Sequence, residues 1–306
     1  MKYIVTGGLG FIGKNLTKHL LRDNHNVLIV DKISIVSDLN YYKKYLSSAR
    51  LMCADINSQL VIDLIDENDV VINCAAESHV DKSFENPVLF TTENIMANHI
   101  FIENIFKRKF SNVKIIHFST DEVYGTNLIE YKNEDAAFKP TNPYSATKAG
   151  MDLLIQSYIK SFGLSIKIVR PNNIYGERQY FEKLIPKLFH HAQTGKAFPL
   201  HGTGENKRHF LHTTDLYNAI MTILNNWEHP YSAYNLASKD EYSVNEIVDK
   251  VKRFFPNLVV SQVADRPFND ERYMIDDSNI RSLGWKPIID FDESFAQISN
   301  ETTFCL

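Results

Sequence analysis

Short apolar runs alternate, through the first half of the chain, with longer segments whose apolar residues recur at helical spacing. Short runs rich in β-branched residues are typical of buried strands. The predicted strands are 2–6, 26–30, 49–53, 69–76, 113–118 and 165–170. Strands that alternate with helical segments predict an α/β fold with a parallel sheet. After residue 171 the alternation gives way to polar, aromatic and histidine-rich segments, which predict a smaller second domain.

A glycine-rich loop directly follows the first predicted strand. Gly7, Gly10 and Gly13 open a helix in the spacing Gly-x-x-Gly-x-x-Gly. Such glycines let the backbone approach a pyrophosphate, and the helix N-terminus supplies free N–H groups. The second predicted strand ends at Asp31, near the offset of about 20 residues expected for a carboxylate that binds ribose hydroxyls. The pattern predicts a Rossmann-type doubly wound sheet that binds a dinucleotide.

Asp31 also bears on which dinucleotide is bound. A carboxylate at this point would repel a 2′-phosphate, so the sequence favours NAD over NADP. The other role open to Asp31 is that of a helix cap or a turn residue. Asp55 and Ile56 follow the third predicted strand and are expected at the edge of the adenine. Ala75 and Ala76 follow the fourth, where small side chains suit both close cofactor contact and tight packing.

An acidic pair lies at the end of the fifth predicted strand. Thr120, Asp121 and Glu122 stand where that strand ends. Ligands of an open parallel sheet bind beyond the carboxyl ends of its strands. Two adjacent carboxylates also repel each other, which raises the pKa of one and separates a proton donor from a proton acceptor. Taken alone, an acidic pair at this place is more often a solvated turn.

A tyrosine and a lysine open a later helix, which follows the turn 140–143 and runs to about Phe162. Tyr144 and Lys148 are four residues apart, so they lie on one helix face. A lysine ammonium held there would lower the phenol pKa from about 10, giving a tyrosinate that can take a proton from an alcohol. Such a pair alone is usually only helix surface. Here a dinucleotide loop precedes it, which favours a catalytic role.

These motifs together resemble the extended short-chain dehydrogenase/reductase family, and most closely its nucleoside-diphosphate-glucose 4,6-dehydratases. The glycine loop and Tyr-x-x-x-Lys are shared by the whole superfamily, whereas the Thr-Asp-Glu block is the specific part. The stretches that carry the resemblance are 6–13, 75–81, 119–125, 142–149, 172–176, 182–186 and 265–273.

The resemblance implies a reaction in which NAD is used but not consumed. Tyr144 would remove the C4 hydroxyl proton while hydride leaves C4, and Thr120 would assist near the C4 oxygen. The resulting ketone acidifies the C5 proton, which Glu122 would take while Asp121 protonates the departing C6 hydroxyl. Hydride then returns to C6. The implied cofactor contacts are Gly7, Gly10, Phe11, Ile12, Gly13, Asp31, Lys32, Asp55, Ile56, Ala75, Ala76, Tyr144 and Lys148.

The resemblance also implies a nucleotide-sugar site on the smaller α/β domain. Asn173 would meet the sugar diphosphate, 182–184 would lie beside the pyrimidine, and Arg208 and Arg266 would bind phosphate. A solvated loop charge is the other role open to Arg208, and a structural role is open to His79. The implied substrate contacts are Ser78, His79, Asn173, Glu182, Lys183, Leu184, Arg208, Asn235, Arg266 and Tyr273.

The implied domains divide the chain twice. The NAD-binding domain comprises 1–171 and 211–237, and the substrate domain comprises 172–210 and 238–306. Phe268-Asn269 resembles the versions that use UDP-glucose more than the bacterial thymidine-nucleotide versions, so both thymine and uracil remain open. The alternative functions are a nucleotide-sugar 4-epimerase or decarboxylase, and a non-catalytic NAD-sensing protein. Neither alternative needs the adjacent acid and base of the Thr-Asp-Glu block.

Composition narrows the class of protein further. The chain has 306 residues, 44% of them hydrophobic, and its net charge of −4 supplies no basic field for nucleic acid. No apolar run approaches the ~18 residues that span a bilayer. A strand that begins at Met1 or Lys2 leaves no room for a signal peptide. Cys53, Cys74 and Cys305 have neither metal nor redox spacing, so we expect buried thiols in a cytoplasmic protein.

Two further features concern partners. The segment 87–109 reads as a long amphipathic helix whose wide apolar surface suggests contact on more than one side, so we expect a homodimer through the long helices. His190 and His191 are adjacent on a predicted helix and point to different faces, with no supporting carboxylate or cysteine spacing. No metal is therefore expected.

Overall fold

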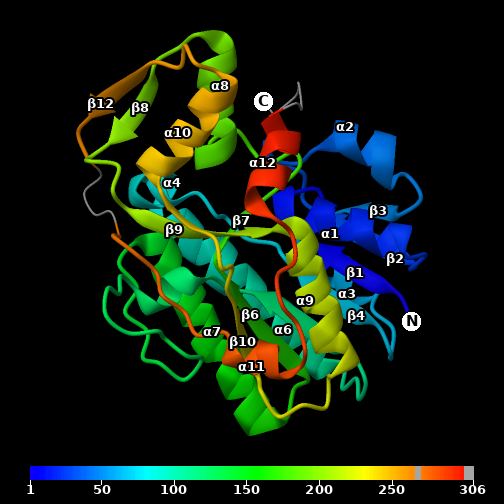
Figure 1. Cartoon of the computed structure of the whole chain (residues 1–306). Helices are drawn as coiled ribbons and strands as arrows, with labels where there is room; N and C mark the ends of the chain where they lie inside the picture. The colour runs from blue at the N-terminus through cyan, green and yellow to red at the C-terminus, as the bar shows by residue number, and fades with distance from the viewer. Residues whose placement is uncertain (266–269, 300–306) are drawn as a thin grey trace.

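A seven-stranded parallel sheet forms the centre of the molecule (Figure 1). The computed structural model describes residues 1–265 and 270–299. Neighbouring strands follow the order β10-β6-β5-β4-β1-β2-β3, and each of these pairs is parallel. The strands are β1 (Tyr3–Thr6), β2 (Val27–Asp31), β3 (Arg50–Cys53), β4 (Val70–Asn73), β5 (Lys114–Phe118), β6 (Ile166–Pro171) and β10 (Ala233–Leu236). The predicted Rossmann-type doubly wound sheet is confirmed, and β10 is a strand that the apolar pattern does not predict.

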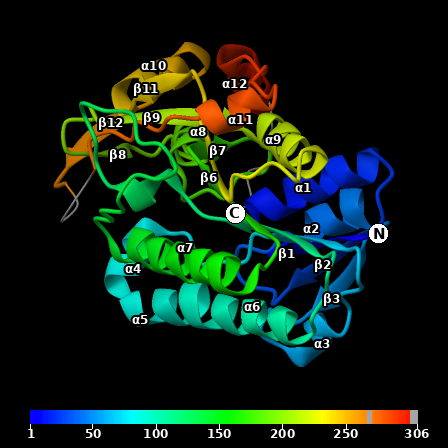
Figure 2. The same ribbon diagram turned by 90° about the horizontal axis from the view of Figure 1, so that it is seen from below.

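Helices cover both faces of this sheet, as Figure 2 shows. One face packs against α1 (Phe11–Arg22) and α9 (Thr213–Asn225) around Leu16, Leu20 and Ile220. The other packs against α6 (Asn98–Lys107) and α7 (Pro143–Phe162) around Phe101 and Ile155. Because each strand is buried on both faces, its residues are apolar in a run rather than in alternation. Two shorter helices, α2 (Leu39–Tyr41) and α3 (Gln59–Ile62), also flank the sheet.

The predicted helix at 87–109 is confirmed, but its middle is wider than an α-helix. It comprises α5 (Pro87–Phe90), the π-helical segment η2 (Thr91–Ala97) and α6. Asn94 and Asn98 are buried on its inner face. Asn94 accepts from the Glu77 N–H at 2.8 Å, and Asn98 donates to the Ala75 carbonyl at 3.3 Å. The wide turn thereby fixes the chain that leaves β4, where cofactor contacts are expected.

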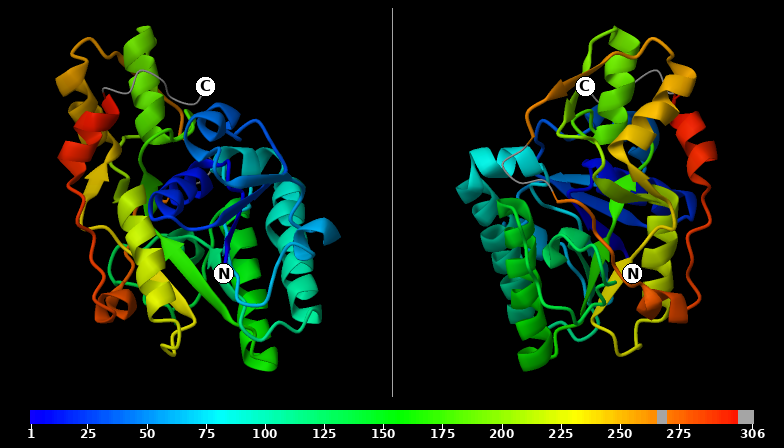
Figure 3. Two further views of the ribbon diagram at one scale, coloured as in Figure 1. Left: turned by 90° about the vertical axis from the view of Figure 1, so that its right-hand side faces the viewer. Right: turned by 60° about the vertical axis from the view of Figure 1, so that its left-hand side comes forward.

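Two small sheets and three helices form a second region, at one end of the molecule (Figures 1 and 3). They share a separate apolar cluster that includes Phe189, Val251 and Phe295. Its elements are β7 (Asn173–Tyr175), α8 (Leu184–Thr194), β8 (Phe198–His201), β9 (Lys207–His212), β11 (Glu241–Ser243), α10 (Val244–Phe254), β12 (Val260–Val263) and α12 (Phe291–Ser299). The packing departs from the expected domain division at one place. Ile280 and Trp285 belong to the core beside the central sheet, because the segment around α11 (Ser278–Ser282) returns to β10.

Within residues 1–265 and 270–299, no helix combines the length and the apolarity needed to cross a membrane. The expected contact Arg266, the Phe268-Asn269 pair and Cys305 lie outside the described residues. The expectation of buried thiols is wrong for Cys53, which ends the strand β3 and is exposed, whereas Cys74 is half-buried.

Candidate active site

The glycine loop joins β1 to α1 and has room for no side chains at its closest approach. Gly7 has a φ of +61°, which favours glycine. A Cβ on Gly13 would lie 2.3 Å from the Gly7 carbonyl oxygen, so helix and loop touch here because both residues are glycine. Gly10 caps α1 without a side-chain hydrogen bond, which leaves the first N–H groups of the helix free of a side-chain acceptor. This cradle fits a pyrophosphate.

Asp31 ends β2 and lies beside that loop. Its Oδ2 accepts from the Leu9 N–H at 3.0 Å, and its Oδ1 accepts from the Ile33 N–H at 2.9 Å and from the Ser37 hydroxyl at 2.8 Å. Asp31 therefore orders its own turn and also faces a pocket. The predicted contacts that line this pocket are Gly7, Gly10, Asp31, Lys32, Asp55, Ile56, Ala75, Ala76, Ser78, His79 and Glu182.

Not every expected cofactor residue reaches this pocket. Phe11 and Ile12 are half-buried against the apolar core between α1 and the sheet. Gly13 is buried at the closest contact between loop and helix. These three residues shape the loop from behind.

The second region meets the pocket through the segment before α8. Lys183 Nζ donates to the Ser78 carbonyl at 2.9 Å, and Glu182 lies 3.1 Å from His79 Nε2. Lys82 approaches the same carboxylate at 3.8 Å. His79 also caps the helix α4 (Val80–Glu85) by accepting from the Lys82 N–H, so it has a structural role as well. Leu184 begins α8 and packs against the apolar cluster of the second region.

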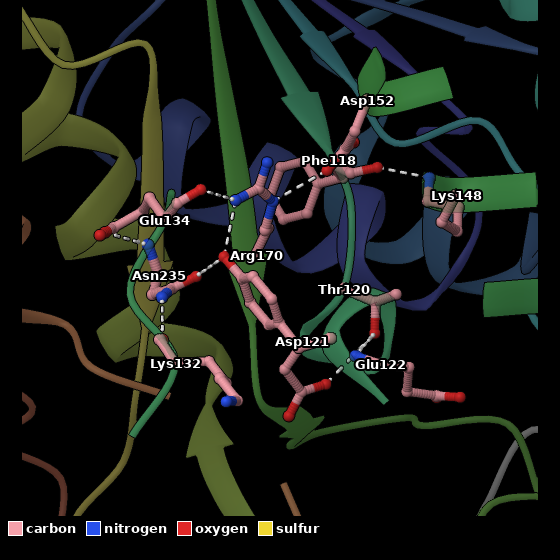
Figure 4. Close-up of polar contacts among 11 residues, drawn as sticks. Phe118, Thr120, Asp121, Glu122, Lys132, Glu134, Lys148, Asp152, Arg170 and Asn235 are labelled. Carbon is pink, nitrogen blue, oxygen red and sulfur yellow. Dashed lines mark hydrogen bonds and ion pairs between the residues drawn. The ribbon is translucent and has the colours of Figure 1, made fainter. Parts of the chain in front are cut away.

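The acidic pair lies on a short 3-10 helix, η3 (Asp121–Tyr124), directly after β5. Thr120 caps it by accepting from the Glu122 N–H at 3.3 Å (Figure 4). Asp121 is buried and its Oδ2 accepts from the Asn172 amide at 2.8 Å. Glu122 Oε2 accepts from the Asn142 amide at 3.1 Å. The solvated-turn alternative is therefore wrong, because each carboxylate has a specific donor.

Both carboxyl groups hold their protons more tightly than usual. Burial raises the pKa of Asp121 to about 7, and the charge of Glu122 contributes a smaller rise against the lowering by Asn172. Burial also raises the pKa of Glu122, opposed by Asn142 and by the charge of Arg208. Repulsion within the pair was the expected cause, and burial proves the larger one. A carboxyl with a pKa near 7 can donate a proton at neutral pH.

Tyr144 and Lys148 lie one turn apart at the start of α7, both buried. Lys148 Nζ donates to the Phe118 carbonyl, and burial lowers the pKa of Lys148 to about 8. The expected fall in the pKa of Tyr144 is not observed. Burial raises that pKa and the charge of Glu122 raises it further, while a hydrogen bond with Thr120 lowers it. Burial of the phenol is thus the main cause of its raised pKa, and the Lys148 ammonium is bonded to the end of β5.

Arg208 closes the site from the second region. Its guanidinium donates to the Asp270 carbonyl at 2.8 Å and lies 4.8 Å from the centre of the Tyr273 ring. The Tyr273 hydroxyl donates to Asp270 Oδ2 at 2.6 Å. The charge of Arg208 lowers the pKa of both Asp121 and Glu122. Arg208 is thus an ordered part of the site and not a solvated loop charge.

The expected substrate contacts Asn235 and Asn173 lie on two different strands, β10 and β7. Asn235 is fully buried, and its amide donates to the carbonyls of Lys132 and Asp276, so the structure does not bring it to the pocket. Asn173 begins β7, next to the Asn172 that holds Asp121. Among the described residues, no three His, Cys, Asp or Glu side chains gather to hold a metal.

Sequence reasoning missed the amides that hold the acid and the base. Asn142 and Asn172 stand inside motifs that carry the family resemblance, next to residues that were singled out. The available signal was an asparagine before the Pro-Tyr helix start and a doubled asparagine after β6. Only the fold reveals which carboxylate each amide meets.

Known proteins are similar in sequence to nearly the whole of this chain. A family model described as GDP-mannose 4,6 dehydratase matches residues 4–298. A trifunctional UDP-glucose 4,6-dehydratase/UDP-4-keto-6-deoxy-D-glucose 3,5-epimerase/UDP-4-keto-L-rhamnose-reductase of Arabidopsis thaliana is 37% identical over 301 residues, which are 92% of this chain and 44% of that protein. The dTDP-D-glucose 4,6-dehydratase of Dictyostelium discoideum is 34% identical, over 95% of this chain and 79% of that protein. This chain thus spans less than half the length of the Arabidopsis relative.

Solved structures agree with these matches. The dTDP-glucose 4,6-dehydratase DesIV from Streptomyces venezuelae, with NAD and TYD bound, superposes with a TM-score of 0.89 at 29% identity, over 98% of this chain and 96% of that one. The dTDP-glucose 4,6-dehydratase of Bacillus anthracis in complex with NAD gives 0.87 at 28% identity, over 98% and 97%. This chain belongs to the family described as GDP-mannose 4,6 dehydratase, within the extended short-chain dehydrogenases/reductases.

Proposed function

We propose that this chain is an NAD-dependent nucleoside-diphosphate-glucose 4,6-dehydratase. The observation that carries the proposal is the pair of carboxyls on one short turn, the buried Asp121 and the half-buried Glu122, whose charges act on Tyr144. A 4-epimerase or a decarboxylase needs no acid and base at this position, and an NAD sensor needs neither. Relatives whose names include UDP-glucose 4,6-dehydratase or dTDP-D-glucose 4,6-dehydratase support the same function.

NAD fits the residues of the pocket. The glycine cradle would hold its pyrophosphate, and Asp31 would accept from its ribose hydroxyls. Asp55 and Ile56 would border its adenine, and Lys32 would lie beside the ribose. The small side chains of Ala75 and Ala76, which line the same pocket, would let the cofactor approach the backbone. When bound, NAD would accept a hydride from the sugar and later return it.

The chain's own residues would move the protons. Tyr144, held by Thr120, would take the proton of the C4 hydroxyl as hydride leaves C4. Glu122 would then take the C5 proton, and Asp121 would give its proton to the C6 hydroxyl, which departs as water while the C5–C6 double bond forms. Return of hydride to C6 and of the Glu122 proton to C5 gives the 4-keto-6-deoxy sugar.

The substrate would bind across the two regions. We place its sugar diphosphate at Asn173 and Arg208, together with Arg266 from outside the described residues, and Tyr273 beside them. The pyrimidine would lie near 182–184, and both thymine and uracil suit the proposal. The division into an NAD-binding domain (1–171 and 211–237) and a substrate domain (172–210 and 238–306) is part of it, apart from the segment around Ile280 and Trp285.

A substrate panel tests this function. Purified protein is incubated side by side with dTDP-glucose, UDP-glucose, CDP-glucose and GDP-mannose, and the alkali-sensitive absorbance of a 4-keto product is followed. We expect product from a pyrimidine-nucleotide glucose and none from the Asp121→Asn, Glu122→Gln double variant, which should still bind NAD. A C4 epimer without dehydration, or equal turnover by the double variant, would refute the proposal.

A second copy of the chain is the proposed protein partner. The outer side of α5, η2, α6 and α7 exposes large apolar side chains, including Val88 at 72% and Leu153 at 58% of their free surface. Further members of this apolar face, as we call it, are Leu89, Met96 and Ile100. A homodimer through these helices would cover them. We also propose the cytoplasm as the compartment, because Cys53 and Cys74 are free thiols.

A further inference from the structure

Arg170 on β6 is a fully buried cation with several fixed partners (Figure 4). Its Nε donates to Asp152 Oδ2 at 2.8 Å, and both side chains of this ion pair have no exposed surface. Its Nη1 donates to the Tyr124 hydroxyl at 2.6 Å and to the Glu134 carbonyl at 3.0 Å. The guanidinium also lies 4.8 Å from the centre of the Phe138 ring. A planar guanidinium with this many partners has a single available orientation.

The partners of Arg170 belong to the two elements that carry the chemistry. Tyr124 is the last residue of η3, the same short helix that begins with Asp121. Asp152 lies on α7 one turn beyond Lys148 and two turns beyond Tyr144, and its charge acts on Lys148. Arg170 is therefore bonded to the acid/base turn and to the Tyr-Lys helix at the same time.

A second group of bonds anchors the Tyr124 side of this link. The Tyr124 hydroxyl donates to Asn235 Oδ1 at 2.9 Å. The Asn235 amide donates to the carbonyls of Lys132 and Asp276, both at 2.9 Å, and Glu134 Oε1 accepts from the Asn235 N–H at 2.8 Å. This arrangement gives Asn235 a place in the fold that differs from the expected substrate contact. It holds the far side of the Tyr124 hydroxyl.

We propose that Arg170 is a positioning residue that holds Asp121 and Glu122 at the correct distance from Tyr144 and Lys148. The inference rests on the proposed function, in which one bound sugar must be oxidised at C4 and lose water across C5 and C6. Oxidation uses α7, and elimination uses η3. A displacement of about 1 Å between such groups can cost on the order of a hundredfold in rate. A rigid buried bridge between the two elements keeps both steps on the same sugar.

The sharpest test removes one arm of the bridge and leaves the charge pair intact. Loss of Arg170 itself would leave the buried Asp152 without its ion-pair partner, so that variant is expected to unfold. Tyr124→Phe keeps the ring and deletes only the hydroxyl between Arg170 and Asn235. We expect its kcat to fall roughly tenfold to a hundredfold with KM within about twofold, because positioning is lost and binding is not.

Stopped-flow absorbance then separates the two half-reactions. In Tyr124→Phe, oxidation at C4 should proceed while elimination slows, so the absorbance of reduced nicotinamide should build up during turnover. The matched control is Tyr217→Phe on α9, where Tyr217 is another buried tyrosine. This change deletes a hydroxyl that donates to Asp23 Oδ2 at 2.7 Å. This control should keep wild-type kinetics. Unchanged kcat in Tyr124→Phe, or an equal fall of both half-reactions, would overturn the inference.

Amide exchange gives a readout that needs no substrate. Tyr124→Phe should speed hydrogen exchange within 119–125 relative to wild type and leave α9 unchanged. Identical exchange within 119–125 would overturn the inference even if no sugar nucleotide is turned over, whereas inactivity of the wild-type protein on every sugar nucleotide would refute the proposed function alone.

Discussion

Opposing effects act on the pKa of Asp121. Burial and the neighbouring charge of Glu122 raise its pKa, whereas the amide of Asn172 and the charge of Arg208 lower it. The outcome, near 7, suits a proton donor at neutral pH. Glu122 has the amide of Asn142 instead, and the positive charges of Arg208 and Lys183 favour its ionised form. The two carboxyls thus differ because their donors differ.

We expect the stability difference between the protein and its Asp121→Asn variant to depend on pH. Folding raises the pKa of Asp121 from 3.8 to about 7, so the folded state binds this proton more tightly. The stabilisation it gives is complete below pH 3.8 and is lost as the pH rises towards 7. Across that window, urea unfolding should show the free energy of unfolding of the variant rising relative to that of wild type, by up to about 1.4 kcal/mol per pH unit. A constant difference would contradict the raised pKa.

At this scale the sequence predicted the reactive groups better than their surroundings. Asp121, Glu122, Tyr144 and Lys148 stand in short motifs at strand and helix ends, so their spacing alone places them at the edge of the sheet. Their pKa values depend on burial and on donors far away in the chain. No local pattern could therefore predict that the pKa of Tyr144 is raised and not lowered.

The elements that carry the site residues are fixed by capping residues and glycines at their starts. The loop before α1 is closed by glycines, α7 begins with a capping box at Asn142, and η3 begins with the cap of Thr120. Capping residues and glycine spacing are local signals, which is why these starts could be predicted. The π-helical turn η2 could not be, because its sequence has ordinary helical periodicity.

We expect Gly13→Ala to damage the loop and the binding of NAD together. The new Cβ would lie 2.3 Å from the Gly7 oxygen and 2.7 Å from the Gly8 Cα, both backbone atoms that cannot rotate away. Overpacking of this kind costs roughly 1–3 kcal/mol, so thermal unfolding should shift down and calorimetric titration should show weaker NAD binding.

The matched control for that variant is Gly150→Ala, within α7. Its Cβ would meet only the flexible end of Ile95, at 3.1 Å, and alanine favours the helix. Stability and NAD affinity close to wild type are expected there. Equal behaviour of the two variants would contradict the close approach at Gly13.

At the scale of the whole molecule, alternation of strand and helix predicted the central sheet because buried parallel strands are apolar runs. The strand β10 and the small sheets escaped prediction. Their strands are three to six residues long and mix aromatic with charged side chains, as in β9 and β11. Their pairing joins segments far apart in sequence, such as β7 with β9 and β8 with β12.

We expect Leu153→Glu to weaken self-association. Leu153 is exposed at 58% on the apolar face, so the monomer should tolerate the change while a dimer would bury the charge. Removing one leucine from such a contact costs about 1.5–3 kcal/mol, which weakens the dimer by roughly tenfold to a hundredfold in sedimentation equilibrium. Leu60→Glu, exposed at 60% on α3, is the control and should leave association unchanged. A wild-type monomer at all concentrations would refute the proposed partner.

The wide turn η2 has a consequence for how this gene can vary. The loss of one codon between Thr91 and Ala97 would remove the extra residue of the wide turn and restore ordinary α-helical spacing there. Asn94 and Asn98 could then no longer both meet the chain after β4, and the deletion would show as lost cofactor affinity in a protein that still folds. A deletion in an outer helix usually costs little. Here the helix holds Ala75, which lines the pocket, so its length also determines the shape of the cofactor site.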